Sequence, residues 1–251
     1  MHQAGTAGIH VVLQAEQIGS FLGIPITNSI AMTWVLMVLL IGGAYLFKRS
    51  LSLRPGKIQA GMEWVFEHSL EYMKELFERD GLAERFFPLV ATIFLFLLIA
   101  NELEFFPGVG SIGFWQHAKF IPLLRTPTTD LNTTLALAFI SFLTIEITGI
   151  FTLGVLKYGK RFINFSSPIG FVVGIIEMIS NTGRIISFSF RLFGNIFAGE
   201  VMVLVAGYFM PYFLPAPLIG FEMFIGFIQA LVFAMLTLFF IKIAIMEPHQ
   251  I

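Results

Sequence analysis

The chain has 251 residues, of which 57% are hydrophobic and 12% charged, and its mean hydropathy is +0.85. Soluble domains carry about 25% charged residues, so this composition predicts a protein whose solvent is lipid. The net charge of −1 excludes a basic surface for nucleic acid. The absence of cysteine excludes disulfide frameworks, thiolate metal sites, iron–sulfur clusters and cysteine nucleophiles.

Five apolar runs are candidates for membrane-crossing helices. A helix rises about 1.5 Å per residue and the hydrocarbon core is roughly 30 Å thick, so each run is long enough to cross. The runs cover residues 30–47, 86–103, 131–156, 171–210 and 218–246. They predict an all-α integral membrane protein in which residues 1–251 form a single membrane domain.

The basic residues predict the orientation of these spans. Residues 1–29 contain no Lys or Arg and so lack the positive region of a signal peptide. Basic residues cluster after the first run and after the third, where they are Lys157, Lys160 and Arg161. The opposite side has only Lys119 and Arg125 in its loops. The positive-inside rule then predicts an N-terminus outside and a C-terminus in the cytoplasm. A bacterial inner membrane is the expected location, although an organelle-encoded chain would look similar.

Two segments between the spans have patterns of their own. Residues 57–80 predict an amphipathic cytoplasmic helix with one apolar stripe, formed by Ile58, Met62, Val65, Tyr72 and Leu76. Glutamates recur every four residues on another face: Glu63, Glu67, Glu71 and Glu75. This helix either rests on the lipid interface or, because an acidic face suits anionic headgroups poorly, docks onto a partner subunit. Residues 105–129 predict an apolar outer loop with a short re-entrant hairpin.

The last two runs are too long for upright crossings. As helices, residues 171–210 would reach about 60 Å and residues 218–246 about 43 Å. Such helices must tilt strongly or lie partly along the interface. Prolines break the chain between them at Pro211, Pro215 and Pro217. The C-terminal third is therefore expected to be a hairpin of two long, strongly tilted helices.

Ionisable residues within the spans are costly in lipid and are functional candidates by default. The spans contain six of them, together with three amides: Glu146, Glu177, Arg184, Arg191, Glu200, Glu222, Asn181, Asn195 and Gln229. The predicted orientation places Glu200 and Glu222 toward the outside. Glu146 and Glu177 fall toward the inside, with Arg191 between the two acidic groups. Interfacial carboxylates are the simpler interpretation of the four acids.

Arg191 has no obvious counter-ion in its own chain. Glu200 is nine residues further on, on the opposite side of a regular helix, and Glu177 lies about 21 Å away along the axis. Gln229 is the best intramolecular neighbour, but it is neutral. Because arginine keeps its proton, we expect compensation by buried water, lipid phosphate or a carboxylate of a separate subunit. The simpler alternatives are a structural Arg191 held by backbone and Gln229, and an Arg184 that snorkels to headgroups.

Three stretches resemble subunit a of the F-type ATP synthase of the bacterial type. Residues 187–200 read SFSFRLFGNIFAGE, residues 229–238 read QALVFAMLTL, and residues 129–132 read TDLN. The resemblance covers nearly the whole chain, including the five spans and the C-terminal hairpin. In that family, subunit a stands beside a ring of c-subunits that each carry one membrane-buried carboxylate.

The resemblance implies a role for each matching residue. Arg191 would face the ring of c-subunits, with Asn195 and Gln229 in support. Glu200 and Glu222 would line the outer half-channel, and some relatives carry histidine at the position of Glu222. The candidates for the inner half-channel are Glu146, Glu177, Ser187 and Arg184. The candidates for outer access are Asp130 and Asn132.

The implied function is that of a proton-translocating stator subunit. Protons would pass through two offset half-channels and turn the ring, which drives ATP synthesis. The chain is not expected to be an enzyme by itself, because ATP chemistry takes place on other subunits, and no cofactor or metal is expected. The implied partners are the ring of c-subunits, b-type subunits of the peripheral stalk and the lipid bilayer, in a hetero-oligomeric complex without nucleic acid.

A stand-alone polytopic secondary transporter that uses its buried carboxylates is the alternative function. Such transporters commonly have paired repeats and interrupted helices, and the sequence has neither. A bis-histidine haem in the bundle is excluded, because all five histidines lie outside the predicted spans: His2, His10, His68, His117 and His249. Co-purification with a ring of small subunits would separate the two functions.

Overall fold

The computed structural model describes residues 15–21, 23–77, 81–106, 108–116, 119–162, 168–211 and 213–246. Residues 1–14 of the predicted outside segment and residues 78–80 of the predicted amphipathic helix lie outside the described residues.

Five helices in these ranges are long and apolar enough to cross a membrane: α1 (Asn28–Ser50), α3 (Leu82–Glu102), α4 (Leu131–Leu153), α6 (Pro168–Phe209) and α7 (Pro215–Ile245). The prediction of a helical multi-span protein is confirmed. All but α4 begin a few residues before the apolar run that predicts them. The Thr27 side chain caps α1 by accepting a backbone N–H, and α6 and α7 begin at prolines, which favour a first helical turn.

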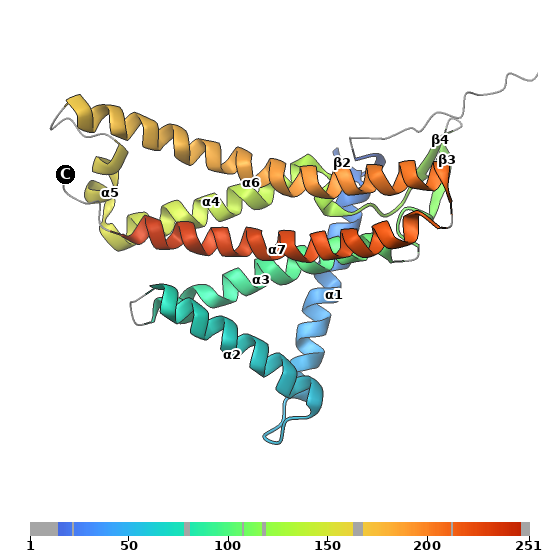
Figure 1. The fold of residues 1–251 in the computed structure, drawn as a ribbon, viewed down its shortest axis with the longest axis horizontal. Helices are drawn as coiled ribbons and strands as arrows, with labels where there is room; N and C mark the ends of the chain where they lie inside the picture. Colours follow the sequence, from blue (N-terminus) through green and yellow to red (C-terminus); the bar gives the residue numbers. More distant parts are fainter. Residues whose placement is uncertain are drawn as a thin grey trace, which may run out of the picture.

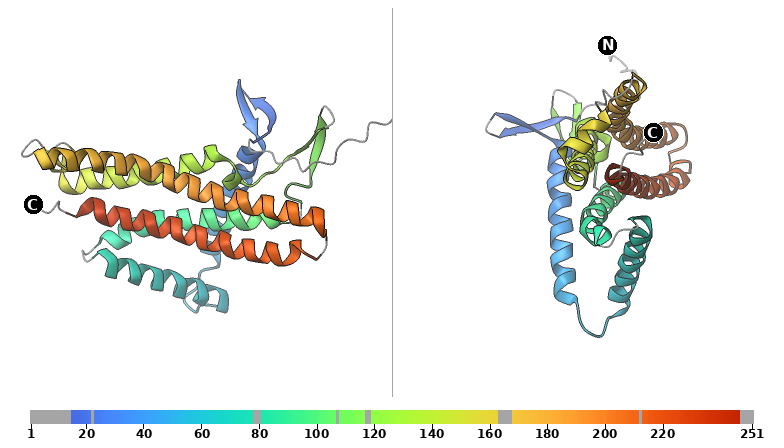
Figure 2. Two further views of the ribbon diagram at one scale, coloured as in Figure 1. Left: turned by 45° about the horizontal axis from the view of Figure 1, so that its top comes forward. Right: turned by 90° about the vertical axis from the view of Figure 1, so that its left-hand side faces the viewer.

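The helices α3, α4, α6 and α7 run side by side along the longest axis of the molecule (Figure 1). Helix α3 packs along α7 and α4 packs along α6, while α6 and α7 form a long hairpin. Their shared core contains the fully buried residues Leu97 of α3, Leu192 of α6 and Ala230 of α7. Helix α1 crosses this bundle at a steep angle (Figures 1 and 2), so the five apolar helices are not parallel.

Helix α2 (Lys57–Phe77) packs against α3 by its C-terminal end. Met73 and Phe77 are buried there in a cluster with residues of α3 and α7. Ile58, Val65 and Tyr72 are instead exposed. Most of the apolar stripe predicted for this helix is therefore not covered by the described part of the chain, whereas Leu76 packs against the buried cluster.

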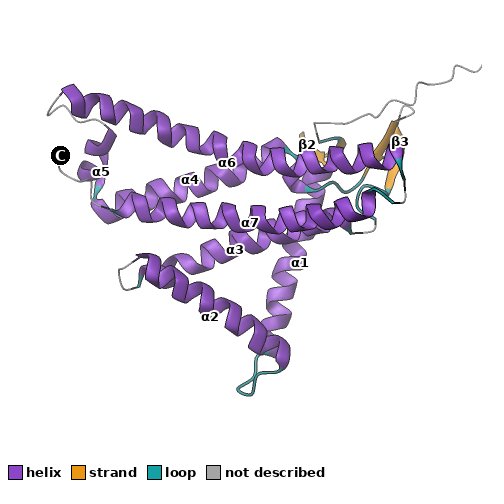
Figure 3. Ribbon diagram, in the orientation of Figure 1, coloured by secondary structure: helices purple, strands orange, loops and turns teal. Residues whose placement is uncertain are grey.

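Two short antiparallel hairpins depart from the all-α prediction (Figure 3). β1 (Gln17–Phe21) pairs with β2 (Ile24–Thr27), and β3 (Gly113–Gln116) pairs with β4 (Lys119–Pro122). The hairpin predicted in the loop of residues 105–129 is thus built from strands, and the β1–β2 hairpin was not predicted. The Asn28 amide donates a hydrogen bond to the Pro122 carbonyl at 3.3 Å, which joins the two regions.

Helix α4 ends at Leu153, before the end of the predicted span at residue 156. Gly154 follows with a φ of +82°, a conformation that favours glycine because it lacks a Cβ. The chain then turns into a separate short helix, α5 (Val155–Phe162), at one end of the bundle (Figure 1). The break matters because it brings α5 back against α4 and α6.

Candidate functional site

Arg191 lies near the middle of α6, on a side of the helix that faces away from the bundle. Ser187, Asn195 and Ala198 share this exposed side, whereas the adjacent Leu192 is fully buried. The Arg191 Nη2 donates a hydrogen bond to the Ser187 hydroxyl at 3.2 Å. No carboxylate of the described chain pairs with Arg191, so its guanidinium is available to a group outside this chain.

The Asn195 amide links this exposed side to the interior. Its Nδ2 donates a hydrogen bond to the Gln229 Oε1 of α7 at 2.8 Å. Gln229 is buried, and its Nε2 has no hydrogen-bond partner among the described residues. Gln229 was expected to be the nearest partner of Arg191; the structure instead pairs it with Asn195, because its side chain points between α6 and α7.

The Glu222 carboxylate lies between the two helices of the hairpin. Its side chain is 2% exposed, and neither carboxylate oxygen has a hydrogen-bond partner in the described ranges. A Cβ built at Gly199 of α6 would collide with this carboxylate. The missing side chain at Gly199 therefore makes the space that Glu222 occupies.

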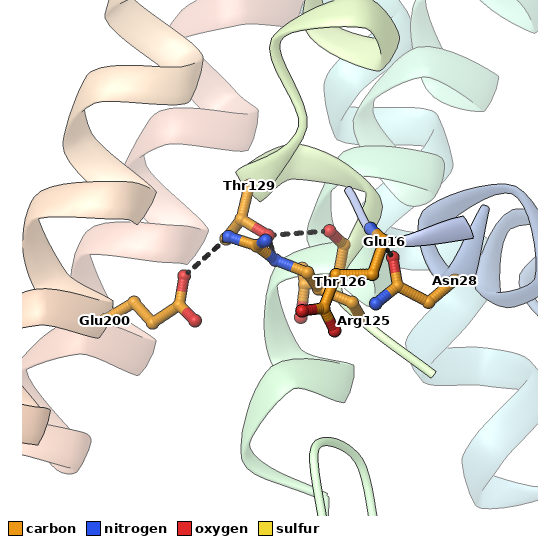
Figure 4. A network of polar contacts seen from close by, with 6 residues as sticks. All are labelled: Glu16, Asn28, Arg125, Thr126, Thr129 and Glu200. Carbon is orange, nitrogen blue, oxygen red and sulfur yellow. Dashed lines mark hydrogen bonds and ion pairs between the residues drawn. The ribbon is translucent and has the colours of Figure 1, made fainter. Parts of the chain in front are cut away.

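The Glu200 carboxylate forms an ion pair with Arg125, at 3.5 Å between Oε2 and Nη2. Arg125 precedes the short 3-10 helix η2 (Pro127–Thr129), and its Nε donates a hydrogen bond to the Thr129 hydroxyl at 3.1 Å (Figure 4). The Arg125 side chain is only 10% exposed. The sequence predicted Arg125 only as a charged residue in a loop. In the structure it is a buried cation beside the Glu200 carboxylate.

A third carboxylate belongs to this region. Glu104, in the 3-10 helix η1 (Leu103–Phe105), interacts electrostatically with Glu200, Glu222 and Arg125. We call these four residues the Arg125 cluster. Sequence reasoning missed Glu104 because the predicted span stopped at residue 103; its position one residue past the end of that span was the available signal.

A second group of polar side chains lies at the other end of the bundle. The Glu146 carboxylate of α4 accepts hydrogen bonds from the Tyr158 hydroxyl at 2.9 Å and from the Asn181 amide at 3.1 Å. Glu177 of α6 forms an ion pair with Arg161 of α5. We call these five residues the Tyr158 cluster. Burial, and then the nearby Glu146 carboxylate, raise the pKa of Tyr158, so its hydroxyl remains a donor.

Arg184 stands beside the Tyr158 cluster. Its guanidinium lies over the Phe240 ring of α7, 4.1 Å from the ring centroid, which is a cation–π contact. It also interacts electrostatically with Glu146 and Glu177. The side chain is therefore held inside the bundle by α4, α6 and α7.

Asp130 and Asn132 lie at the start of α4, where Asp130 is the N-cap. The Asp130 Oδ1 accepts from the backbone and the side chain of Asn132, at 3.0 and 3.1 Å. Its Oδ2 accepts a 2.6 Å hydrogen bond from the Ser29 hydroxyl of α1. In this structure the pair caps one helix and ties a second helix to it.

The sequence-predicted residues thus fall into three places along α6. Glu177 lies in the Tyr158 cluster, Arg191 lies in the middle, and Glu200 lies in the Arg125 cluster. The acids were predicted to form two separate groups with Arg191 between them, and they do so in the fold. The sequence did not show that each acidic group contains an arginine. Arg161 lies in the Tyr158 cluster and Arg125 lies in the Arg125 cluster.

Comparison with known proteins gives the family. The family profile described as ATP synthase A chain matches residues 30–242. The chain is 34% identical over 218 residues to ATP synthase subunit a of Moorella thermoacetica, covering 87% of this chain and 90% of the relative. It is 34% identical over 250 residues to ATP synthase subunit a of Syntrophobacter fumaroxidans, covering 96% and 94%. The Geotalea daltonii protein of that name is 33% identical over 222 residues, covering 88% and 89%. The chain therefore belongs to the ATP synthase subunit a family.

Proposed function

We propose that this chain is the proton-translocating stator subunit of an F-type ATP synthase. Arg191 stands against a rotating ring of c-subunits and separates two offset half-channels, so that proton flow drives rotation and ATP synthesis. The observation that carries this proposal is the position of Arg191 on the outward side of α6, without a carboxylate partner in the described chain. ATP chemistry takes place on other subunits of the complex.

The physics of a fixed arginine supports this role. A ring carboxylate that meets Arg191 is stabilised in its ionised form by the positive charge and releases its proton. Away from Arg191 the same carboxylate faces lipid and must be protonated, because an ionised carboxylate there is costly. Arg191 also repels protons that would pass directly between the half-channels. Each crossing proton supplies about 2.3 kcal/mol per 100 mV of membrane potential.

The outer half-channel runs through the Arg125 cluster. Glu222 is a buried carboxylate with no hydrogen-bond partner in the described residues, and Glu200 and Glu104 lie near it. Asn195 and Gln229 continue from there toward Arg191. Asp130 and Asn132 belong to the access side of this path.

The inner half-channel runs from Ser187 past Arg184 to the Tyr158 cluster. Ser187 contacts Arg191, and the carboxylates of Glu146 and Glu177 lie toward the other end of the bundle. The two half-channels are offset because their acids lie at opposite ends of the α6–α7 hairpin. A proton can pass from one to the other only by way of the ring.

The hairpin is strongly tilted in the membrane, and the steep crossing of α1 over α6 and α7 supports this (Figure 1). If α1 stands perpendicular to the bilayer, α6 and α7 lie crosswise to it and follow the curved side of the ring of c-subunits. We place the N-terminus outside and the C-terminus in the cytoplasm of a bacterial inner membrane. The cytoplasmic helix α2 presents Ile58, Val65 and Tyr72 to a b-type subunit of the peripheral stalk.

Cysteine cross-linking tests the proposal, because the chain has no cysteine of its own. Ala198 is exposed on the side of Arg191, so Ala198→Cys should cross-link to a cysteine placed beside the c-subunit carboxylate. Ile186 is also exposed but lies about 140° around the helix from Arg191. Ile186→Cys is the matched control and should not cross-link. Equal yields at the two positions, or none at Ala198, would contradict the proposal and favour a stand-alone transporter.

A further inference from the structure

Helix α5 contacts both acids of the Tyr158 cluster, although it has only 8 residues. It lies between the end of α4 and the beginning of α6, next to the end of α7 (Figures 1 and 2). Its sequence suggested only a few positive charges after a span. In the structure, Tyr158 and Arg161, three residues apart on α5, each bind a different carboxylate.

Tyr158 is packed as closely as a core residue. Its side chain is 4% exposed, and its ring lies so close to Gly149 of α4 that a Cβ there would collide with it. The hydroxyl donates to one oxygen of Glu146, while Asn181 of α6 donates to the other. Both oxygens of this carboxylate are therefore oriented, one by α5 and one by α6.

Arg161 fixes the second acid. Its Nε pairs with the Glu177 carboxylate, and its Nη1 donates to the Ile243 carbonyl near the end of α7 at 3.4 Å. The side chains of Arg161 and Glu177 are 15% and 24% exposed, so the pair is largely removed from solvent. One guanidinium thus ties α5 to both helices of the long hairpin.

We infer that Tyr158 and Arg161 are positioning residues of the inner proton path, holding the Glu146 and Glu177 carboxylates in fixed orientations at its end. This inference rests on the proposed function. A group that passes protons must stay within hydrogen-bond reach of the next group. A glutamate side chain without such partners samples several rotamers and loses that reach.

The charges at this end of the bundle support a shared site. Arg161 and Arg184 bring two positive charges, and Glu146 and Glu177 bring two negative ones, with mutual electrostatic interactions. The Tyr158 hydroxyl donates a hydrogen bond to Glu146, and burial raises its pKa further from neutral pH, so it acts as a donor and not as an acid. The arrangement orients both acids with equal numbers of basic and acidic side chains.

Two single substitutions in the complete complex test the inference. Tyr158→Phe keeps the ring over Gly149 and removes only the hydroxyl, and Arg161→Gln removes the cation. Each should lower the initial rate of ATP-driven proton pumping about tenfold, which is the smaller effect that losing an orienting partner has at metal sites. Lys160→Gln removes one charge from an exposed position of the same helix and should pump at the normal rate. Pumping by Tyr158→Phe and Arg161→Gln equal to that of Lys160→Gln would overturn the inference.

A charge swap separates positioning from simple stabilisation. The double variant Arg161→Glu with Glu177→Arg rebuilds the ion pair but moves the carboxylate from α6 to α5. We expect it to restore assembly, measured as the amount of purified complex, but not pumping. Recovery of both would show a purely structural pair and overturn the role of Arg161. In the same assay, pumping by Arg191→Ala would overturn the proposed function itself, whereas normal pumping by the α5 variants beside an inactive Arg191→Ala would overturn only this inference.

Discussion

The Glu222 carboxylate of α7 fills the space that a side chain at Gly199 of α6 would occupy. The two helices of the long hairpin therefore pack together here through a buried acid that lies against a glycine. Glu200 and its partner Arg125 are adjacent to this point. The acids proposed to line the outer half-channel thus lie around Gly199, a position without room for a side chain.

Gly199→Ala is expected to damage this region. A methyl group there forces the Glu222 carboxylate to move or the helices to separate, and overpacking of this kind costs about 1–3 kcal/mol. Gly220→Ala is the matched control, because a Cβ at Gly220 meets nothing within 4 Å. The midpoint of heat-induced dissociation of the purified complex should fall for Gly199→Ala and stay unchanged for Gly220→Ala. Equal midpoints would mean that the close approach is absent.

Arg125 and Glu200 should be energetically coupled. Replacing Arg125 leaves the partly buried Glu200 carboxylate without this ion-pair partner, which is costly. We expect Arg125→Met and Glu200→Gln each to lower stability and pumping, with a loss in the double variant smaller than the sum by about 0.5–3 kcal/mol. Thermal dissociation of the four complexes measures this double-mutant cycle. Strictly additive losses would show that the two side chains do not interact.

Glu222→Gln should slow proton transfer through the outer half-channel. Glutamine fits the same space above Gly199 but cannot release a proton, so one titrating group is lost from the path. The initial rate of ATP-driven pumping, measured across a range of pH, should fall and change its pH dependence. Glu222→Asp keeps the acid and should retain part of the rate. An unchanged pH–rate profile in Glu222→Gln would remove Glu222 from the channel.

Asp130→Ala should destabilise the start of α4. The substitution removes the N-cap, at a cost of about 1 kcal/mol, and the 2.6 Å hydrogen bond from Ser29 of α1. Asp130→Asn retains a capping side chain and serves as the control. The thermal midpoint of the complex should therefore fall more for alanine than for asparagine. The opposite order would show that the cap contributes nothing to this helix.

The helices were predictable because each apolar run is long and uninterrupted. The sequence analysis missed two features at the ends of the apolar runs. One is the turn at Gly154 that separates α5 from α4, and the other is Glu104, one residue past the predicted span. Single residues with special backbone angles or 3-10 turns leave little trace in hydropathy. The short strand pairs were missed for the same reason, since four or five residues carry too weak an alternation.

The sequence indicated most of the polar residues inside the spans, but not how they pair. Helical spacing correctly excluded Glu200 and Glu177 as partners of Arg191. It could not show that Arg125, 75 positions before Glu200, supplies the cation for that acid. Such contacts depend on how helices pack, and a local pattern carries no information about them. Arg161 was likewise interpreted only as a charge that orients the chain.

Arg191 gives the most direct test of the whole account. ATP-driven proton pumping should be abolished in an assembled complex that carries Arg191→Ala, because no fixed cation then separates the half-channels or discharges the ring. Arg191→Lys keeps the charge but loses the planar fork of donors, so its pumping should be severely impaired. Coupled pumping by Arg191→Ala at a measurable rate would contradict the account.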